Sequence, residues 1–326
     1  MKNGAATAGV AAAAMLLVCS PSLSAPFPTS DQNPLLLGFD LPTPWSARLT
    51  SPGTTSVGAT LNWSSTAVIQ RDAAEMLIVD AESREWRIDL EHTFTDRFAL
   101  RAQLPYRSVG AGTLDGFIDN WHSIFGLPEG ERPVLPHDQY RINYQRDGIV
   151  RFNDADTSHT GLGNVRLEAG YRLAVSRASA TSMWLSVKLP TAANYALTGN
   201  AVDIGVGIAN ERDLSSRWRI YGQAAAVHLG SGRVLTEQQR SWLLQGFLIF
   251  DYLAGDALTL TMQLEGHTAV YKDSGLDQLG NAWLLTFGGD YRFTNNWRVQ
   301  FGIGEDVKVE ASPDVNFVLN VSKGWR

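Results

Sequence analysis

The sequence predicts an all-β fold, a transmembrane antiparallel up-and-down β-barrel of about 12 strands. Three observations predict it. Stretches of about ten residues that alternate apolar and polar side chains recur along most of the chain. The connections between them alternate between short and long. Aromatic residues stand near the ends of the stretches, where a barrel meets the two membrane interfaces.

The first 25 residues are organised as a secretory signal peptide. Lys2 gives a positive start, residues 11–18 form an apolar run, and Ser22–Ala25 are the small residues expected before a cleavage site. The apolar run is shorter than the roughly 20 residues that cross a bilayer. The only cysteine, Cys19, lies in this segment. We therefore predict export through the periplasm and a mature chain without disulfides.

The alternation starts at about Ser56, which divides the mature chain. Residues 26–54 are interpreted as an N-terminal periplasmic lead-in, and residues 55–326 as the outer-membrane β-barrel. No stretch after the signal is apolar enough for a membrane helix. A chain that crosses lipid without helices must pair all its strands in a closed barrel, because unpaired backbone groups are too costly there.

Each stretch should present one apolar and one polar face, because successive side chains of a strand point to opposite sides. Trp86, Ile88 and Leu90, for example, alternate with Arg87 and Asp89. The stretches are residues 57–63, 86–94, 98–107, 164–173, 183–189, 202–208, 218–229, 242–253, 258–265, 283–293, 297–303 and 315–325. Two of them, 218–229 and 242–253, are so apolar that the pattern does not assign their facing.

Short and long connections alternate, as in outer-membrane barrels with short periplasmic turns and long extracellular loops. The short ones are Thr95–Arg97, Ser176–Thr181, Asp213–Arg217, Ala254–Asp256 and Thr294–Asn296. The long ones are Thr66–Arg84, Gly110–Gly163, Thr191–Ala201, Gly230–Arg240, Lys272–Asn281 and Glu305–Pro313. This order places both termini on the short-turn side. The strand-like stretch Arg141–Phe152 falls inside the longest loop, so we expect it outside the membrane.

A soluble β-sandwich also alternates, because one face of each sheet packs in a core and the other meets water. Aromatic residues on the apolar faces favour the barrel instead, since they resemble interfacial girdles. They are Trp63, Phe94, Phe98, Trp218, Trp283, Phe293, Trp297 and Trp325. The opposite faces combine charged residues with glycine, as a crowded lumen requires.

Charged side chains of both signs lie on the faces that the pattern assigns to the lumen. The lumen-lining candidates are Arg87, Glu91, Arg101, Arg166, Glu168, Arg172, Lys188, Glu265, His267, Asp290 and Arg292. Two arrangements remain open. The charges line a water-filled pore and set its selectivity, or they pair across a narrow lumen and fill it.

The longest loop contains an amphipathic helix within Leu114–Pro128, which ends at Gly126 and Pro128. Its apolar residues at helical spacing include the plug candidates Phe117, Ile118, Trp121, Ile124 and Phe125. Three placements are open: a plug inside the lumen, a helix at the outer-leaflet interface, or a helix packed on its own loops. Packing on the loops is favoured, because exposed aromatic faces otherwise aggregate.

The sequence resembles domain-of-unknown-function family three-one-eight-seven. The resemblance rests on Leu104–Tyr106, on Leu114–Pro128 ahead of Gly161–Asn164, and on the strand-rich remainder. It covers most of the mature chain. It implies an uncharacterised outer-membrane β-barrel of a Gram-negative bacterium, and it brings no assigned activity, substrate or catalytic residue.

Function is therefore argued from the predicted barrel. We expect a porin-like pore or facilitator for small polar solutes. The alternatives are a barrel enzyme acting on envelope lipid or glycan, motivated by Glu265 beside His267, and a non-conducting structural or recognition barrel. No nucleophile elbow, zinc-binding histidine pair or phosphate loop is present, so no catalytic residue, metal or cofactor is assigned. The expected partners are outer-membrane lipid, a small polar solute and the barrel-assembly machinery; the net charge of −6 disfavours nucleic acid.

Overall fold

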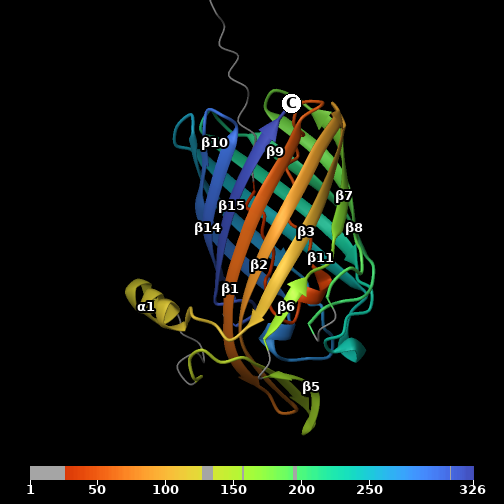
Figure 1. Cartoon of the computed structure of the whole chain (residues 1–326), viewed down its shortest axis with the longest axis vertical. Coiled ribbons are helices and arrows are strands. Elements are labelled where there is room, and N and C mark those ends of the chain that lie inside the picture. Colours follow the sequence, from red (N-terminus) through yellow and green to blue (C-terminus); the bar gives the residue numbers. More distant parts are fainter. Residues whose placement is uncertain (1–25, 127–134, 156–157, 194–196, 309) are drawn as a thin grey trace, which may run out of the picture.

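The structure is a computed structural model of the chain (Figure 1). It describes residues 26–126, 135–155, 158–193, 197–308 and 310–326. The expected signal peptide, residues 1–25, lies outside the described residues. None of the helices in the described ranges is long and apolar enough to cross a bilayer.

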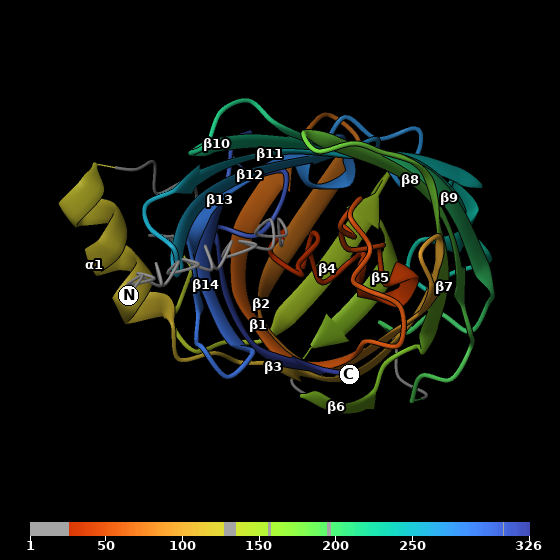
Figure 2. The same ribbon diagram turned by 90° about the horizontal axis from the view of Figure 1, so that it is seen from above.

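Twelve strands form a closed antiparallel barrel, as the sequence predicts (Figures 1 and 2). In order around the barrel they are β1 (Thr55–Arg71), β2 (Glu75–Thr95), β3 (Phe98–Gly110), β7 (Arg166–Val175), β8 (Ser179–Lys188), β9 (Asp203–Asp213), β10 (Trp218–His228), β11 (Trp242–Leu253), β12 (Leu258–His267), β13 (Ala282–Arg292), β14 (Trp297–Asp306) and β15 (Val315–Trp325). The first and last strands close the ring, with Thr55 opposite Trp325. Neighbours in the ring are neighbours in the chain, apart from the excursion between β3 and β7.

The barrel is apolar outside and polar inside. Trp86, Ile88 and Leu90 of β2 are 44%, 48% and 47% exposed, whereas the intervening Arg87 is 5% exposed. A water-soluble sandwich has the reverse distribution, with its large apolar side chains covered. The stretches 218–229 and 242–253, whose facing the sequence pattern did not assign, follow the same rule. Trp218 and Trp242 point outward.

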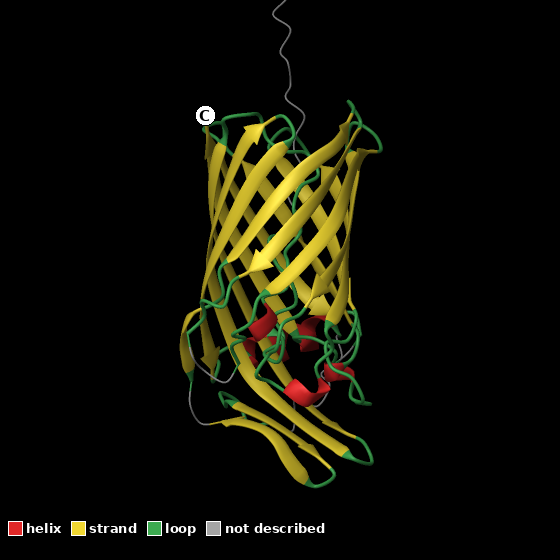
Figure 3. Ribbon diagram, turned by 90° about the vertical axis from the view of Figure 1, so that its right-hand side faces the viewer, coloured by secondary structure: helices red, strands yellow, loops and turns green. Residues whose placement is uncertain are grey.

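We call the end of the barrel with the C-terminus and short turns the turn end, and the opposite end the loop end (Figure 3). At the loop end β4 (Arg141–Arg146) and β5 (Ile149–Ala155) extend β2, and β6 (His159–Leu162) pairs with β3. The stretch 141–152 thus lies beyond the barrel ring. The sequence-based loop Thr66–Arg84 is wrong, because β1 and β2 continue as one hairpin whose last register pair is Arg71 and Met76.

The helix α1 (Asp115–Phe125) lies outside the barrel wall, so the luminal-plug placement is wrong (Figure 2). Ile118 is fully buried in a cluster with Val315 of β15, against which Phe317 also packs. The ring centroids of Phe117 and Phe317 lie 5.6 Å apart, and Trp121 Nε1 donates to Glu305 Oε1 at 3.0 Å. The apolar side of the helix therefore packs on the outer wall. Ile124 is 76% exposed, and the side chain of Phe125 lies outside what the structure describes.

Residues 26–54 run inside the barrel (Figure 2), where we expected a periplasmic lead-in. We call them the inner segment. Almost every residue from Pro26 to Leu49 is buried, although the segment has no strand. Five prolines between positions 26 and 44 explain this, because proline lacks the N–H that a strand ladder needs. The segment has no alternating pattern that predicts a place inside the barrel. Its burial comes from contact with the barrel wall, and so the alternation rule does not reveal it.

Candidate functional site

The inner segment enters and leaves the lumen at the turn end. Pro26 and Thr54 line a cavity of about 690 Å³ there, together with Trp325 of the last strand. The segment reaches toward the loop end and turns back at Leu37–Phe39, a single 3-10 turn. Asp40 then takes a left-handed conformation with φ of 47°. The segment is therefore a loop with both ends at one mouth of the barrel.

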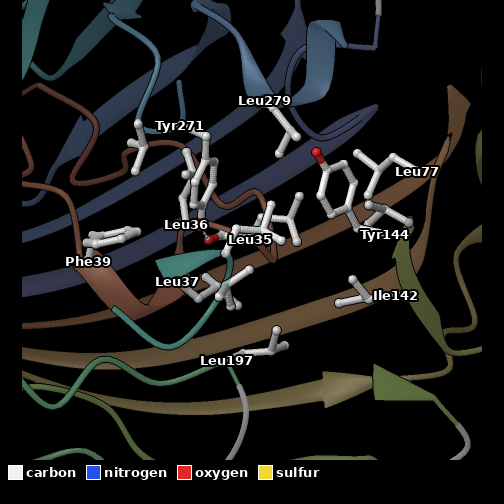
Figure 4. Close-up of a cluster of buried hydrophobic side chains, with 14 of the residues drawn as sticks. Leu35, Leu36, Leu37, Phe39, Leu77, Ile142, Tyr144, Leu197, Tyr271 and Leu279 are labelled. Atoms are coloured by element: carbon white, nitrogen blue, oxygen red, sulfur yellow. Dashed lines mark hydrogen bonds between the residues drawn. The ribbon is translucent and has the colours of Figure 1, made fainter. Parts of the chain in front are cut away.

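The tip of the loop is apolar and closes the loop end (Figure 4). Leu35, Leu36, Leu37 and Phe39 are each at most 5% exposed. They share one cluster with side chains of the β1–β2 hairpin, β4 and the loop-end connections, namely Val68, Leu77, Val79, Ile142, Tyr144, Leu197, Leu235, Tyr271 and Leu279. Within this cluster the Tyr271 hydroxyl donates to Leu35 O at 2.7 Å.

One wall of the lumen holds the segment through basic side chains. Five of them, from β2, β3, β7 and β8, donate to backbone carbonyl groups of the segment. Arg87 donates to Pro28 O at 2.6 Å, Arg101 to Pro44 O at 3.2 Å and to Thr43 O at 3.2 Å, Arg107 to Leu37 O at 2.8 Å, Arg166 to Phe39 O at 3.4 Å, and Lys188 to Gly38 O at 2.8 Å. All five side chains are at most 8% exposed.

The opposite wall holds the entering arm. Gln263 of β12 accepts from Phe27 N at 2.9 Å, and Asn316 of β15 donates to Thr29 Oγ1 at 3.0 Å. Asp31 is bound by Glu265 and His267, the two residues that motivated the enzyme alternative. His267 Nε2 lies 2.9 Å from Asp31 Oδ2, and Glu265 Oε1 accepts from Asp31 N at 3.3 Å. These two side chains therefore fix the segment.

The returning arm is anchored by Trp45 and Arg48. Trp45 Nε1 donates to Glu91 Oε2 at 2.9 Å, and its ring lies 5.0 Å from the Arg101 guanidinium carbon. Gly170 of β7 leaves room for this ring, because a Cβ there would lie 2.7 Å from it. Arg48 pairs with Glu211 at 3.1 Å, and with Asp213 at 2.8 Å.

The structure places the lumen-lining candidates as follows. Arg87, Arg101, Arg166, Glu168, Lys188, Glu265, His267 and Asp290 are buried inside the barrel, and Glu91 is half-buried there. Arg292 is half-buried beside the turn-end cavity, and Arg172 is half-exposed near the same end of β7. The structure thus brings most of the set together around the inner segment.

Sequence reasoning missed the groups of the inner segment, above all Asp31, Trp45 and Arg48. The run Leu35–Leu37 was the signal that could have found it. Three consecutive leucines are unexpected in a segment exposed to the periplasm, because they favour burial. The barrel lumen is the nearest place where they can be buried.

The lumen is constricted between the two ends. Besides the turn-end cavity, a cavity of about 600 Å³ opens at the loop end beside Gln70 and Glu310. A gap of about 20 Å³ lies between the segment and the basic wall, lined among others by Thr43, Arg107 and Arg166. This gap holds about one water molecule. The inner segment therefore fills much of the lumen at this level.

The family described as "Protein of unknown function (DUF3187)" matches residues 10–325. The chain belongs to this family. The expected family is confirmed, and its description assigns no activity. Among curated proteins, none matches the sequence significantly.

Solved structures with a similar fold include the COG4313 outer membrane channel from Pseudomonas putida F1. It is 14% identical, with a TM-score of 0.61 over 86% of this chain and 99% of that one. The NanC porin is 8% identical, with a TM-score of 0.46 over 82% and 98%. The KdgM porin is 9% identical, with a TM-score of 0.43 over 83% and 99%. At this identity the first of these shows that the DUF3187 chain shares the fold of that channel.

Proposed function

We propose that this DUF3187 protein is an outer-membrane channel for small polar solutes, gated by the inner segment. The observation that carries the proposal is a closed barrel whose apolar outside suits lipid and whose polar lumen is filled by a loop with both ends at one mouth. The short turns then face the periplasm and α1 faces the exterior. Outer-membrane lipid and the assembly machinery are the partners that such a barrel requires.

The contacts of the inner segment support a gate. The segment is held by hydrogen bonds and ion pairs to the wall, and its two ends lie together at the turn end. It can therefore withdraw without unthreading the chain. Water replaces each lost hydrogen bond, so the net cost of a bond is only about 0.5–1.5 kcal/mol, and the larger cost of opening is the exposure of the apolar tip.

The filled lumen favours a second candidate, a non-conducting recognition barrel. In that case the tip cluster and wall contacts form a permanent core. An enzyme is not proposed, because Glu265 and His267 are occupied by Asp31.

A reversible lock separates the two candidates. Asn316 Nδ2 and Thr29 Oγ1 lie 3.0 Å apart, so we would introduce the cysteine pair T29C and N316C into the full chain. Single-channel recordings in planar bilayers should show openings with reductant, which disappear on oxidation. The two single-cysteine variants are the controls and should be insensitive to oxidation. A complete absence of openings in the wild type and in the reduced pair would support the non-conducting barrel.

A further inference from the structure

The basic wall that holds the inner segment is electrically balanced by acids on the same wall. Its five basic residues are those that donate to the segment, and its acids are Glu85, Asp89, Glu91, Glu168 and Asp203. Five cations against five carboxylates give this surface no net charge once the segment leaves. We call these ten side chains, with Gln103, the mixed track.

The strand register arranges the track in rows across the barrel. In one row Glu91, Arg101 and Glu168 are successive cross-strand partners on β2, β3 and β7. In the next row, Asp89, Gln103, Arg166, Lys188 and Asp203 follow one another from β2 to β9. The first row therefore alternates acceptor, donor and acceptor, whereas the second row places the cations Arg166 and Lys188 side by side, between Gln103 and Asp203.

Each basic side chain of the track divides its donors between the wall and the segment. Lys188 Nζ lies 2.7 Å from Asp203 Oδ2 and donates to Gly38 O at 2.8 Å. Arg87 pairs with Glu85 and Asp89 and still gives one N–H to a carbonyl group of the segment. The wall acids thus offset the charge, and four of the five basic side chains give their remaining donors to uncharged carbonyl oxygens of the segment, whereas Arg107 also pairs with the segment carboxylate of Asp40.

We infer that the mixed track binds uncharged, hydroxyl-rich solutes such as small saccharides when the inner segment withdraws. A hydroxyl group accepts from Arg or Lys, as the carbonyl groups of the segment do here, and also donates to the neighbouring carboxylates. A carboxylate ion only accepts, so it would leave the wall acids without a donor and face their charge. This inference rests on the proposed channel and names its class of solute.

Liposome swelling with three probes of the same carbon skeleton tests the inference. Glucose is uncharged, gluconate is an anion and glucosamine is a cation at neutral pH. With the full-length protein, or with its Gly170→Ala variant if the wild type stays closed, glucose should enter faster than both charged probes. Faster entry of gluconate would overturn the inference in favour of an anion pathway, and equal rates would show that the track does not select.

Two substitutions that unbalance the track should change the order of the charged probes. Arg166→Gln leaves one carboxylate in excess and should raise the ratio of glucosamine to gluconate entry by about fivefold. Glu91→Gln should lower it by about fivefold. This factor corresponds to the ~1 kcal/mol between unit charges about 4 Å apart in water. Arg151→Gln, on the exposed strand β5, is the matched control and should leave the ratio unchanged.

Folding of each variant is checked by its heat-dependent mobility on a gel. If Arg166→Gln and Glu91→Gln conduct but leave the ratio of glucosamine to gluconate entry unchanged, the inference is refuted and the proposed channel is not. An absence of flux for every probe, in the wild type and in Gly170→Ala, would refute the channel itself, and the inference would fall with it.

Discussion

Arg166 of β7 and Lys188 of β8 are direct cross-strand partners, and they donate to the adjacent carbonyl groups of Phe39 and Gly38. Two cations thus lie side by side within the barrel. Lys188 has a carboxylate partner in Asp203, whereas none of the carboxylates in the described ranges lies within ion-pair distance of Arg166. The inner segment depends on this pair at the point where it turns back.

We predict that Lys188→Met destabilises the barrel strongly, because it leaves Asp203 as a buried charge without its partner. Asp203 is fully buried, and breaking such a pair costs about 3–5 kcal/mol. The midpoint temperature of heat-induced unfolding, measured by the mobility shift on a gel, should fall clearly. The double variant Lys188→Met with Asp203→Asn should recover most of the loss, and an unchanged midpoint in the single variant would contradict the prediction.

Gly170→Ala should loosen the inner segment without harming the strand. The new Cβ would lie 2.7 Å from the ring of Trp45, and relieving such an overlap typically costs about 1–3 kcal/mol. We expect more frequent channel openings in bilayer recordings. Gly222→Ala on β10 is the matched control, because its Cβ would meet nothing within 4 Å. Equal opening frequencies in the two variants would argue against Trp45 as an anchor.

Undocking α1 should leave conductance unchanged, because the helix lies outside the wall. Ile118→Ala removes a fully buried side chain from the contact with β15, at a cost of about 2–5 kcal/mol. Cleavage by an added protease near residues 112–126 should become faster. Ile124→Ala, at a position that is 76% exposed, should not have this effect. A larger conductance in Ile118→Ala would restore the idea of a helical plug.

Alkaline pH should weaken the loop-end cluster through Tyr144. Burial, helped by a hydrogen bond to Glu75, raises the pKa of the Tyr144 phenol from 10.0 to about 12. The folded state therefore disfavours the phenolate, so this stabilisation is complete below pH 10 and is lost as the pH rises toward about 12. The heat-shift midpoint of the wild type should fall between pH 10 and 12 relative to that of Tyr144→Phe, and parallel curves for the two proteins would refute this.

The barrel could be predicted because its strands carry their own signal. Arg87 is surrounded in sequence by Trp86 and Ile88, and a period of two is enough to say that it faces away from lipid. The same rule placed Lys188 and Glu168 inside. The hairpin beyond Thr66 escaped prediction because consecutive residues on both of its faces are buried there, so its apolar and polar residues do not alternate.

The inner segment could not be predicted by this route. Its stability comes from residues far away in the sequence, such as Gln263, which binds Phe27 across 236 positions. A proline-rich stretch has no periodic alternation of apolar and polar residues. Its position becomes clear only from its contacts with the barrel wall. The helix α1 shows the converse. Its amphipathic pattern was recognised, but a pattern does not say which apolar surface the helix will meet, and Phe317 of the outer wall provides it.

The position of both ends of the inner segment at the turn end bears on biogenesis. The ring closes only when β15, the last strand to be synthesised, pairs with β1. A segment that begins and ends at one mouth can enter a barrel that is already closed, since the chain does not have to be threaded from one mouth to the other. We therefore expect strand closure and filling of the lumen to be two separate steps of folding.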